Sequence, residues 1–478
     1  MLRSAGISPF LYRQIYDRIR TSIADGKLRA GDKLPPSRIL AAEFNVARGT
    51  VDAAYALLCG EGYAVSKPRS GMVVAPAVQN LSRNRASSTH LSMDDREDFT
   101  IVFEPPAPLM PGLPSFDLFP RKLWCRLVAR QARRLDATEL SYPDPIGSLR
   151  LRTAVTNYLA VSRGVRCHPD QVIITGGYLA AVTFLCQVLT KSGAKVLLET
   201  PGYNFTRRMI TTLGRIPVDV RVDDEGLDIE FGFRTAQDAA LCIVAPSYQF
   251  PLGVCMSLTR RLSLLDWASR KGGWIIEDDY GGEFRYDGWP LPALKSLDDN
   301  ERVFYVGTFS KTLFPGLRLG YIVVPTSQLS RVRHAARRLE GGRPSLEQAV
   351  VAEFLEAGHF ARHLKKMKTA YRRRKATLEE AVEQTLGHQF SARPINGGLN
   401  LLLNVAHGVS DLQLAARAAA AGLRPLALSP LGRSPLNPKG LLLGFGNLPE
   451  TQALPTVRRL KSALGGTAPL PARIRQHS

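Results

Sequence analysis

The sequence predicts two folded parts of different class: a small N-terminal α+β module, then a large α/β domain with a smaller α+β part near its C-terminal end. Three observations predict this division. Ile15, Ile19 and Ile23 recur every four residues, as on one face of a helix. Beyond residue 170, apolar strand-like runs alternate with helical patterns, which is typical of a mostly parallel sheet covered on both faces. Between these parts, residues 76–114 show neither pattern.

The domain boundaries follow from these patterns. We assign residues 1–75 to the N-terminal module, 76–114 to a linker, 115–465 to the large domain and 466–478 to a tail. The smaller part is expected from about residue 345 to 465. The linker is first polar and then Pro-rich, "EPPAPLMPGLPS", which favours an extended tether. His90 lies inside it and is interpreted as a solvated side chain.

The composition bounds the class of protein. Of 478 residues, 45% are hydrophobic and 22% charged, as in soluble globular proteins, and no apolar run reaches the ~18 residues of a membrane span. Residues 1–30 lack the pattern of a signal peptide. Six scattered cysteines without a CxxC pair argue against a disulfide framework or a metal site, and favour a reducing cytoplasm. The net charge of +21 favours a polyanionic partner, nucleic acid above all, although a basic solvated surface is the plainer alternative.

The first 75 residues are predicted to form three helices and a hairpin. The isoleucine helix is followed by a short helix, "SRILAAEF", with Ser37 as its expected N-cap. The third helix should bury one face, made of Val51, Ala54, Tyr55 and Leu58. "YAVSKPRSGMVVA" has the pattern of a hairpin with a basic tip. Three helices and a basic hairpin make a winged helix-turn-helix, which places its third helix in the major groove of DNA.

The module strongly resembles the GntR family over about 70 residues, and the family pattern "KLPxSRxLAxxxxVxRxTVxxAYxxLxxEGY" appears almost intact at residues 33–63. The resemblance implies contacts with double-stranded operator DNA from Arg38, Arg48, Thr50, Lys67 and Arg69. One position departs from the pattern. Ala47 stands where the family usually has Ser, and loss of such a helix cap costs about 0.5–2 kcal/mol of local stability. The alternative for this module is a bundle that serves only dimer contacts.

Unusual residues gather at the predicted ends of strands in the large domain, where ligands of α/β sheets bind. "ITGGYLAAV" joins a strand to a helix start, which favours a phosphate. "PGY" places Tyr203 after another strand, where a tyrosine can stack on a planar ring or simply fill the core. "IIEDDYGGEF" ends a strand in three carboxylates, which are costly to bury without a cation.

Lys311, in "GTFSKTLFPGLRLGY", follows another apolar stretch and has several possible roles. It does not belong to a phosphate loop, because Ser310 replaces the Gly that such a loop needs before its Lys. It is either a solvated surface lysine or a Schiff-base lysine. Arg318 follows as a planar phosphate clamp. A phosphate turn, a stacking ring, a carboxylate and an amine together match the needs of pyridoxal 5′-phosphate (PLP).

These motifs resemble those of fold-type I PLP-dependent aminotransferases over residues ~116–465, and the whole chain is similar to the MocR subfamily of GntR regulators. The resemblance implies that Lys311 forms the Schiff base, Asp278 pairs with the ring nitrogen, Tyr280 bonds the ring hydroxyl and Tyr203 stacks on the ring. It further implies a set of residues around the phosphate and the ring: Gly176, Gly177, Tyr178, Thr308, Ser310, Arg318 and, near the ring hydroxyl, Gln249.

Three departures bear on function. The phosphate turn reads Gly-Gly-Tyr-Leu instead of Ser-Gly-Ala-Gln, and Asn400 stands where the subfamily often has His. Leu442 occupies the position where aminotransferases commonly place the Arg that binds the substrate carboxylate. Three arginines remain as possible substitutes: Arg207, Arg208 and Arg343.

The sequence therefore favours a cytoplasmic, homodimeric transcriptional regulator that senses PLP or a small amino compound and has no membrane partner. The rival interpretation is a working aminotransferase that carries a DNA-binding module, against which Leu442 weighs. A third is a cofactor-free interaction domain in which Lys311 is idle.

Overall fold

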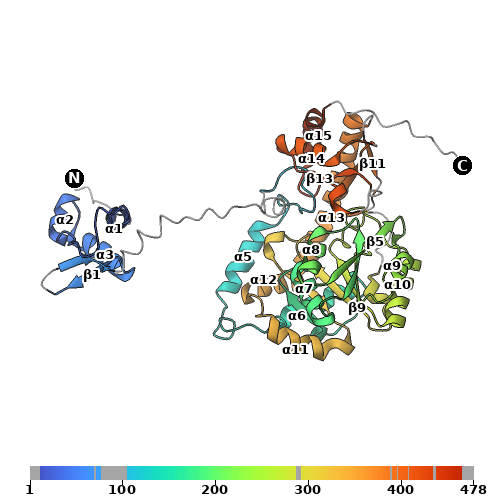
Figure 1. Cartoon of the computed structure of the whole chain (residues 1–478), viewed down its shortest axis with the longest axis horizontal. Helices are drawn as coiled ribbons and strands as arrows, with labels where there is room; N and C mark the ends of the chain where they lie inside the picture. The colour runs from blue at the N-terminus through green and yellow to red at the C-terminus, as the bar shows by residue number, and fades with distance from the viewer. Residues whose placement is uncertain are drawn as a thin grey trace. The chain divides into compact units, whose positions relative to one another are not determined.

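The computed structural model describes residues 11–68, 71–76, 105–286, 292–387, 390–393, 395, 397–406, 408–433 and 438–465. The chain divides between residues 104 and 105 into two compact units (Figure 1). Within the described residues, every helix is too short or too polar to cross a bilayer.

The N-terminal unit has the three helices and the hairpin that the sequence predicts. Its elements are α1 (Leu11–Ala24), α2 (Ser37–Glu43), α3 (Arg48–Gly60), β1 (Ala64–Lys67) and β2 (Gly71–Val74). The two strands pair antiparallel, with Ala64 opposite Val74. The predicted apolar faces of α1 and α3 are buried together, and Ile15, Val51 and Leu58 belong to one core cluster.

The helix starts differ in part from the prediction. Ser37 is the first residue of α2 and not its N-cap; that position belongs to Pro36, which provides no side-chain cap. The Ser37 hydroxyl instead accepts a hydrogen bond from Arg48 Nε at 3.1 Å. Ala47 occupies the N-cap position of α3, again without a side-chain cap, as the departure from the family pattern predicts.

The second unit is built on an eight-stranded sheet in the order β3-β10-β9-β8-β7-β4-β5-β6. Its strands are β3 (Val172–Thr175), β4 (Lys195–Thr200), β5 (Ile216–Asp223), β6 (Gly226–Leu227), β7 (Leu241–Val244), β8 (Trp274–Asp279), β9 (Val303–Thr308) and β10 (Gly320–Val323). Strands β5, β4, β7, β8 and β9 run parallel, as expected, whereas β10 is antiparallel to β9 and β3. The central strands β7 and β9 are buried along nearly their whole length because helices cover both faces of the sheet (Figure 1).

The helices of the large part are α5 (Arg121–Ala132), α6 (Leu149–Ser162), α7 (Tyr178–Leu189), α8 (Asn204–Thr212), α9 (Ile229–Thr235), α10 (Leu258–Lys271), α11 (Leu329–Leu339) and α12 (Ser345–Glu356). Helix α12 was predicted to open the smaller part. Its Val351 and Phe354 are instead buried with Leu151 of α6, so α12 belongs to the core of the large part.

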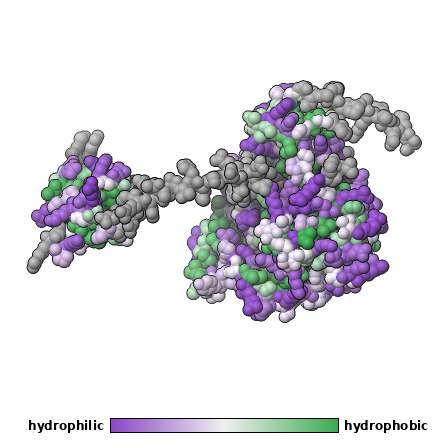
Figure 2. Space-filling model, in the orientation of Figure 1, coloured by the Kyte–Doolittle hydropathy of each residue, from purple (hydrophilic) through white to green (hydrophobic). Residues whose placement is uncertain are grey.

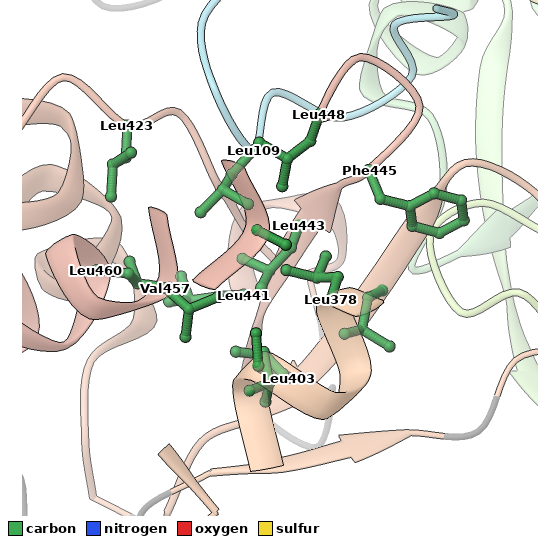
Figure 3. Packing of buried hydrophobic residues seen from close by; sticks show 14 of the residues in the cluster. Leu109, Leu378, Leu403, Leu423, Leu441, Leu443, Phe445, Leu448, Val457 and Leu460 are labelled. Carbon is green, nitrogen blue, oxygen red and sulfur yellow. The ribbon is translucent and has the colours of Figure 1, made fainter. Parts of the chain in front are cut away.

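The smaller part begins with the long helix α13. It comprises α13 (His359–Leu386), α14 (Asp411–Ala420), α15 (Glu450–Leu464) and an antiparallel sheet of β11 (Ser391–Arg393), β12 (Asn400–Asn404), β14 (Gly440–Gly444) and β13 (Leu426–Ala427), in that order. One face of this sheet packs against α13 and α15 through a cluster that includes Leu378, Leu441 and Leu460 (Figure 3).

Residues 105–114 are a second correction to the predicted boundaries, because they belong to the second unit and not to a linker. Leu109 is 1% exposed and lies among the leucines of β14 and the residues of α15 (Figure 3). Its carbonyl accepts a hydrogen bond from Gly444 N at 2.9 Å. The segment is not the extended tether that its prolines suggest, because Leu109 has a φ of 66° and residues 111 and 112 form a turn.

The surfaces of both units are largely hydrophilic in the view of Figure 2, with hydrophobic residues scattered between. Some large apolar side chains are nonetheless exposed close together in sequence: Leu140 (73%), Tyr142 (97%) and Leu149 (61%).

Candidate functional site

A cavity lies at the carboxyl ends of the parallel strands of the second unit. It is lined from β4 and the turn after it by Glu199 and Tyr203, and from β8 by Asp278 and the adjacent Tyr280. Helices α7 and α8 add further residues of the wall: Tyr178, Asn204, Thr206 and Arg207. The expected gathering of functional residues at this edge of the sheet is therefore what the structure shows.

Strand β8 separates its three carboxylates by the alternation of side chains along a strand. Glu277 accepts hydrogen bonds from the backbone of Leu294 and Lys295, both at 2.7 Å. Asp279 Oδ2 accepts from Arg163 Nε and from the Tyr305 hydroxyl, both at 2.6 Å. These two carboxylates are thus committed to the protein itself.

Asp278 points the other way, into the cavity. Its Oδ1 is buried and has no hydrogen-bond partner among the described residues. Burial raises the pKa of Asp278 well above its ordinary value, and the nearby Asp279 and Glu199 raise it further, while Lys311 opposes them. The Tyr280 hydroxyl is likewise buried without a partner in the described chain. Asp278 and Tyr280, two positions apart, therefore present unsatisfied polar atoms, which native proteins rarely leave without a ligand or ordered water.

Lys311 follows β9 and lies close enough to Asp278 for the two groups to affect each other's ionisation. Its Nζ donates a hydrogen bond to the carbonyl of Gly112 at 2.7 Å. Burial lowers the pKa of Lys311 to about 8, although Asp278 favours the charged amine. A substantial fraction of this amine is therefore neutral, and nucleophilic, near physiological pH.

Two guanidinium groups lie over the glycine turn between β3 and α7. Gly177 has a φ of 97° and precedes the first residue of α7, and a Cβ there would lie 3.7 Å from Arg318 Cζ. A Cβ at Gly176 would lie 3.3 Å from Arg343 Nη1. A glycine turn at the start of a helix, with a guanidinium beside it, is suited to an anion, although Arg343 is also paired with Glu340. Arg343 was considered only as a carboxylate ligand from the sequence, and the structure places it at this turn instead.

Thr308 and Ser310 stand at the end of β9, next to Lys311. Their hydroxyls are 3.0 Å apart, and the Thr308 hydroxyl also accepts a hydrogen bond from the Ser310 backbone N–H at 3.2 Å. Since β9 and β3 both pair with β10, these hydroxyls lie at the same sheet edge as the glycine turn.

Aromatic side chains form one wall of the cavity. Tyr203 is 42% exposed, and its ring centroid is 6.1 Å from that of Tyr178 and 6.0 Å from that of Phe250. The Tyr178 hydroxyl is 3.0 Å from Thr206 Oγ1. Tyr203 thus lines the same cavity as Asp278 with part of its side chain exposed.

Gln249 does not join these residues. Its Nε2 donates to the carbonyls of Pro201 and Phe250, at 2.8 and 2.6 Å, and its Oε1 accepts from Leu252 N at 3.1 Å. Gln249 is 1% exposed and is absent from the cavity wall, so its contacts are those of a loop brace and not of a ring-hydroxyl ligand.

Glu199 is a site residue that the sequence reasoning missed. It lines the cavity and accepts a hydrogen bond from Ala245 N at 3.3 Å, and burial raises its pKa to about 8 although hydrogen bonds with Ala245 and Gln249 oppose this. The signal was available: "VLLETPGY" ends an apolar strand in a carboxylate, as "IIEDDY" does.

The wall near Leu442 is apolar. Leu442 is fully buried in β14 among Tyr248, Leu402 and Leu431, and Leu431 reaches the cavity. Of the three arginines considered as substitutes, Arg207 lines the cavity and forms an ion pair with Asp219. Arg208 instead lies over the ring of Phe205, at 5.9 Å.

The predicted DNA-contacting residues gather on α2, α3 and the hairpin. Arg38 lies in α2 and is exposed, and Arg48 opens α3, where its Nε is 3.6 Å from Asp52 Oδ2. Thr50 is in the first turn of α3, and Lys67 ends β1. Arg69 lies outside the described residues.

The comparisons with known proteins agree with both units. Residues 11–74 match the family described as bacterial regulatory proteins, gntR family, and residues 120–422 match aminotransferase class I and II. The second unit is similar in fold to a kynurenine aminotransferase from Pyrococcus horikoshii, with a TM-score of 0.69 and 24% identity over 76% of this chain and 92% of that one. It also resembles LysN, an α-aminoadipate aminotransferase from Thermus thermophilus, with a TM-score of 0.67 and 27% identity over 74% of this chain and 90% of that one.

Fold and site thus define a DNA-binding regulator built on an aminotransferase-type unit. The chain is 34% identical to the probable rhizopine catabolism regulatory protein MocR of Rhizobium meliloti, over 95% of this chain and 93% of that one. It is 32% identical to the pyridoxine biosynthesis regulator PdxR of Corynebacterium glutamicum, over 91% and 92%. The chain belongs to this family of HTH-type transcriptional regulators, in which a gntR-type domain precedes an aminotransferase class I and II domain.

Proposed function

We propose that the second unit binds PLP covalently at Lys311, and that PLP, or an amino compound reacting with it, controls how this regulator binds operator DNA. The observation that carries the proposal is the pairing of Lys311 with Asp278: a buried amine with a lowered pKa beside a buried carboxyl with an unsatisfied oxygen. A solvated surface lysine would show neither burial nor such a neighbour.

The residues present fit PLP at each of its polar groups. Asp278 Oδ1, which is buried without a partner among the described residues, would meet a ring nitrogen, and the Tyr280 hydroxyl would meet a ring hydroxyl. The glycine turn with Arg318, Thr308 and Ser310 would hold the phosphate. Bound PLP supplies an aldehyde that condenses with primary amines and a ring that withdraws electrons.

The protein's own groups set the conditions for this chemistry. Lys311 offers a partly neutral amine, and Asp278 supplies a negative charge that a pyridinium would stabilise. Tyr203, which lines the cavity, would stack on one ring face and exclude water from that side. Glu199 sits next to Asp278 as a second buried carboxyl and disfavours two negative charges in the cavity, so a cationic ring relieves the pair.

The lining also bears on the effector. Leu442 leaves an apolar wall where a substrate carboxylate would find an arginine in an aminotransferase, which disfavours efficient turnover of ordinary α-amino acids. Arg207 lines the cavity at α8 and is the guanidinium to which an acidic amino compound would bind.

A homodimer completes the proposal. Leu140, Tyr142 and Leu149 expose apolar side chains within ten residues of sequence, which is the kind of surface that subunits cover. Two-fold assembly would present two winged helices to paired half-sites of an operator.

The test compares wild type with Lys311→Ala and Arg48→Ala. We expect PLP to give wild type a visible absorption band that Lys311→Ala lacks, and to change operator affinity in wild type but not in Lys311→Ala. Arg48→Ala should keep the band and lose affinity for the operator, with the salt slope reduced by about one. A band of equal strength in Lys311→Ala would overturn the cofactor assignment. Sustained amino-group transfer over many turnovers would instead favour an enzyme.

A further inference from the structure

The backbone of Gly112 joins residues from the two parts of the second unit. Its N–H donates to Asn400 Oδ1 at 3.0 Å, and its carbonyl accepts from Lys311 Nζ at 2.7 Å. Asn400 begins β12 of the small sheet and is 3% exposed, whereas Lys311 follows β9 of the large sheet. A hydrogen-bonded path therefore runs from the small sheet through one peptide backbone to the reactive amine.

Glycine is required at this point. Gly112 has a φ of +73°, which other residues rarely adopt, and a Cβ there would lie 2.9 Å from Lys311 Nζ. Any side chain would push the amine away from the carbonyl. The close approach of amine and backbone is thus a property of this position and not an incidental contact.

The segment around Gly112 is otherwise held by the smaller part. The carbonyl of Pro108 accepts from Arg424 N at 2.9 Å, that of Leu109 accepts from Gly444 N, and Ser115 N donates to the Tyr371 hydroxyl at 2.9 Å. The Lys311 contact ties this segment to the end of the large sheet. It lies a few residues after position 105, where the chain enters the second unit.

We propose that Asn400 is a positioning residue for Lys311. It fixes the backbone of Gly112, whose carbonyl holds the amine, and covalent attachment of Lys311 to PLP removes the hydrogen bond between that amine and the carbonyl. This inference rests on the proposed function, because it needs the attachment to occur. In the condensation, Lys311 Nζ forms a C=N bond, and its two hydrogens leave with the aldehyde oxygen as water. The Gly112 carbonyl then loses the donor that it has in the free protein.

The consequence is a mechanical link from the covalent site to the N-terminal edge of the second unit. With Lys311 free, residues 105–117 are held from both sides, by the small sheet and by the amine. With Lys311 attached, the segment keeps its contacts with the small sheet and loses the one at the large sheet. A change at the amine is thereby passed to the part of the chain that leads to the DNA-binding unit.

Hydrogen exchange of the full-length protein tests this. We expect amides in residues 105–118 of wild type to exchange about tenfold faster after PLP is attached than before, as loss of a hydrogen bond to a charged group implies. Asn400→Ala should show the fast exchange already without PLP and change little on loading. Asn400→Asp keeps the acceptor oxygen and should restore protection in the free protein.

A matched control is available on the same strand. Asn404 donates to the Ser391 hydroxyl at 3.3 Å and has no part in the path, so Asn404→Ala should behave as wild type. Equal effects of the two alanine variants, or unchanged exchange in a wild type that has acquired the visible band, would overturn the inference. Failure of the band itself would instead refute the proposed function. Should Asn400→Ala not fold, Lys311→Met provides the second route: fast exchange with or without PLP supports the path, and full protection refutes it.

Discussion

Arg163 and Asp279 form a buried ion pair on the face of β8 that turns away from Asp278, with Nε and Oδ2 2.6 Å apart and both side chains at most 2% exposed. The pair separates the carboxylate that serves the fold from the one that faces the cavity. Arg163 balances the negative charge of Asp279, and Asp278 remains available to a ligand.

Arg163→Met should destabilise the protein strongly, because it leaves Asp279 charged and buried without its partner. We expect a loss of about 3–5 kcal/mol in the free energy of unfolding, measured by urea denaturation. Arg150→Met is the control, since Arg150 and Glu356 form a pair that is 43% exposed on each side and should contribute at most about 1 kcal/mol. Similar losses in both variants would show that burial does not set the value of the pair.

The reactivity of Lys311 should rise with pH around its lowered pKa. An amine with a pKa of about 8 becomes half neutral there, whereas an ordinary lysine does so near pH 10.4. We expect acylation of Lys311 in PLP-free protein, followed by mass spectrometry, to reach half its limiting rate near pH 8. In Asp278→Asn the carboxyl that favours the charged amine is gone, so the midpoint should move to lower pH. A midpoint near that of the exposed lysines would show that the pocket does not tune this amine.

Glu199 should make stability depend on pH in the opposite sense to an ordinary paired carboxylate. Burial raises its pKa from 4.5 to about 8, so between these values the folded protein holds a proton that the unfolded chain has released. The proton that Glu199 keeps in the folded protein contributes stability that is fully present below pH 4.5 and is lost as the pH rises toward 8.

In Glu199→Gln the fall of stability with pH should become less steep by about 1.4 kcal/mol per pH unit, as urea denaturation at several pH values would reveal. The raised pKa values of Asp278 and Glu277 account for the slope that remains. The exposed Glu139 supplies the control, because Glu139→Gln removes a carboxyl from solvent and should leave the wild-type profile in place. An unaltered slope in Glu199→Gln would mean that another buried carboxyl, such as Glu277, causes it.

Arg207 should distinguish acidic amino compounds from plain amines. With PLP attached, we expect Arg207→Gln to weaken binding of amino acids about tenfold or more and to leave simple alkylamines unchanged, as followed by the visible spectrum. Arg208→Gln is matched in sequence but lies on the Phe205 ring outside the cavity wall, and it should resemble wild type. Equal weakening for acids and amines would place the acidic group elsewhere.

The architecture was largely predictable because strand and helix periods are local properties of the chain. The apolar runs before Gly176, Asp278 and Lys311 appear as β3, β8 and β9, and these residues stand at the predicted strand ends. Alternation along β8 also explains which carboxylate is available, although the sequence alone does not show which face of the strand meets the cavity.

What could not be predicted depends on contacts between distant positions. Gly112 and Asn400 are separated by 288 residues, so the sequence alone does not show that the Pro-rich stretch around Gly112 packs against the small sheet. Gln249 lies in the loop that follows β7, but its side-chain amide is hydrogen-bonded to the surrounding backbone. Arg343 follows no strand of the site and reaches the glycine turn only through the packing of the segment before α12.

The antiparallel strand β10 has one more implication. Since β9 ends at Thr308 and β10 begins at Gly320, Lys311 and Arg318 lie in the same short connection between two strands. An insertion or deletion inside it would displace both the proposed Schiff-base lysine and the proposed phosphate ligand at once. Homologous chains should therefore vary in length at other positions and keep the length of the connection between β9 and β10 constant.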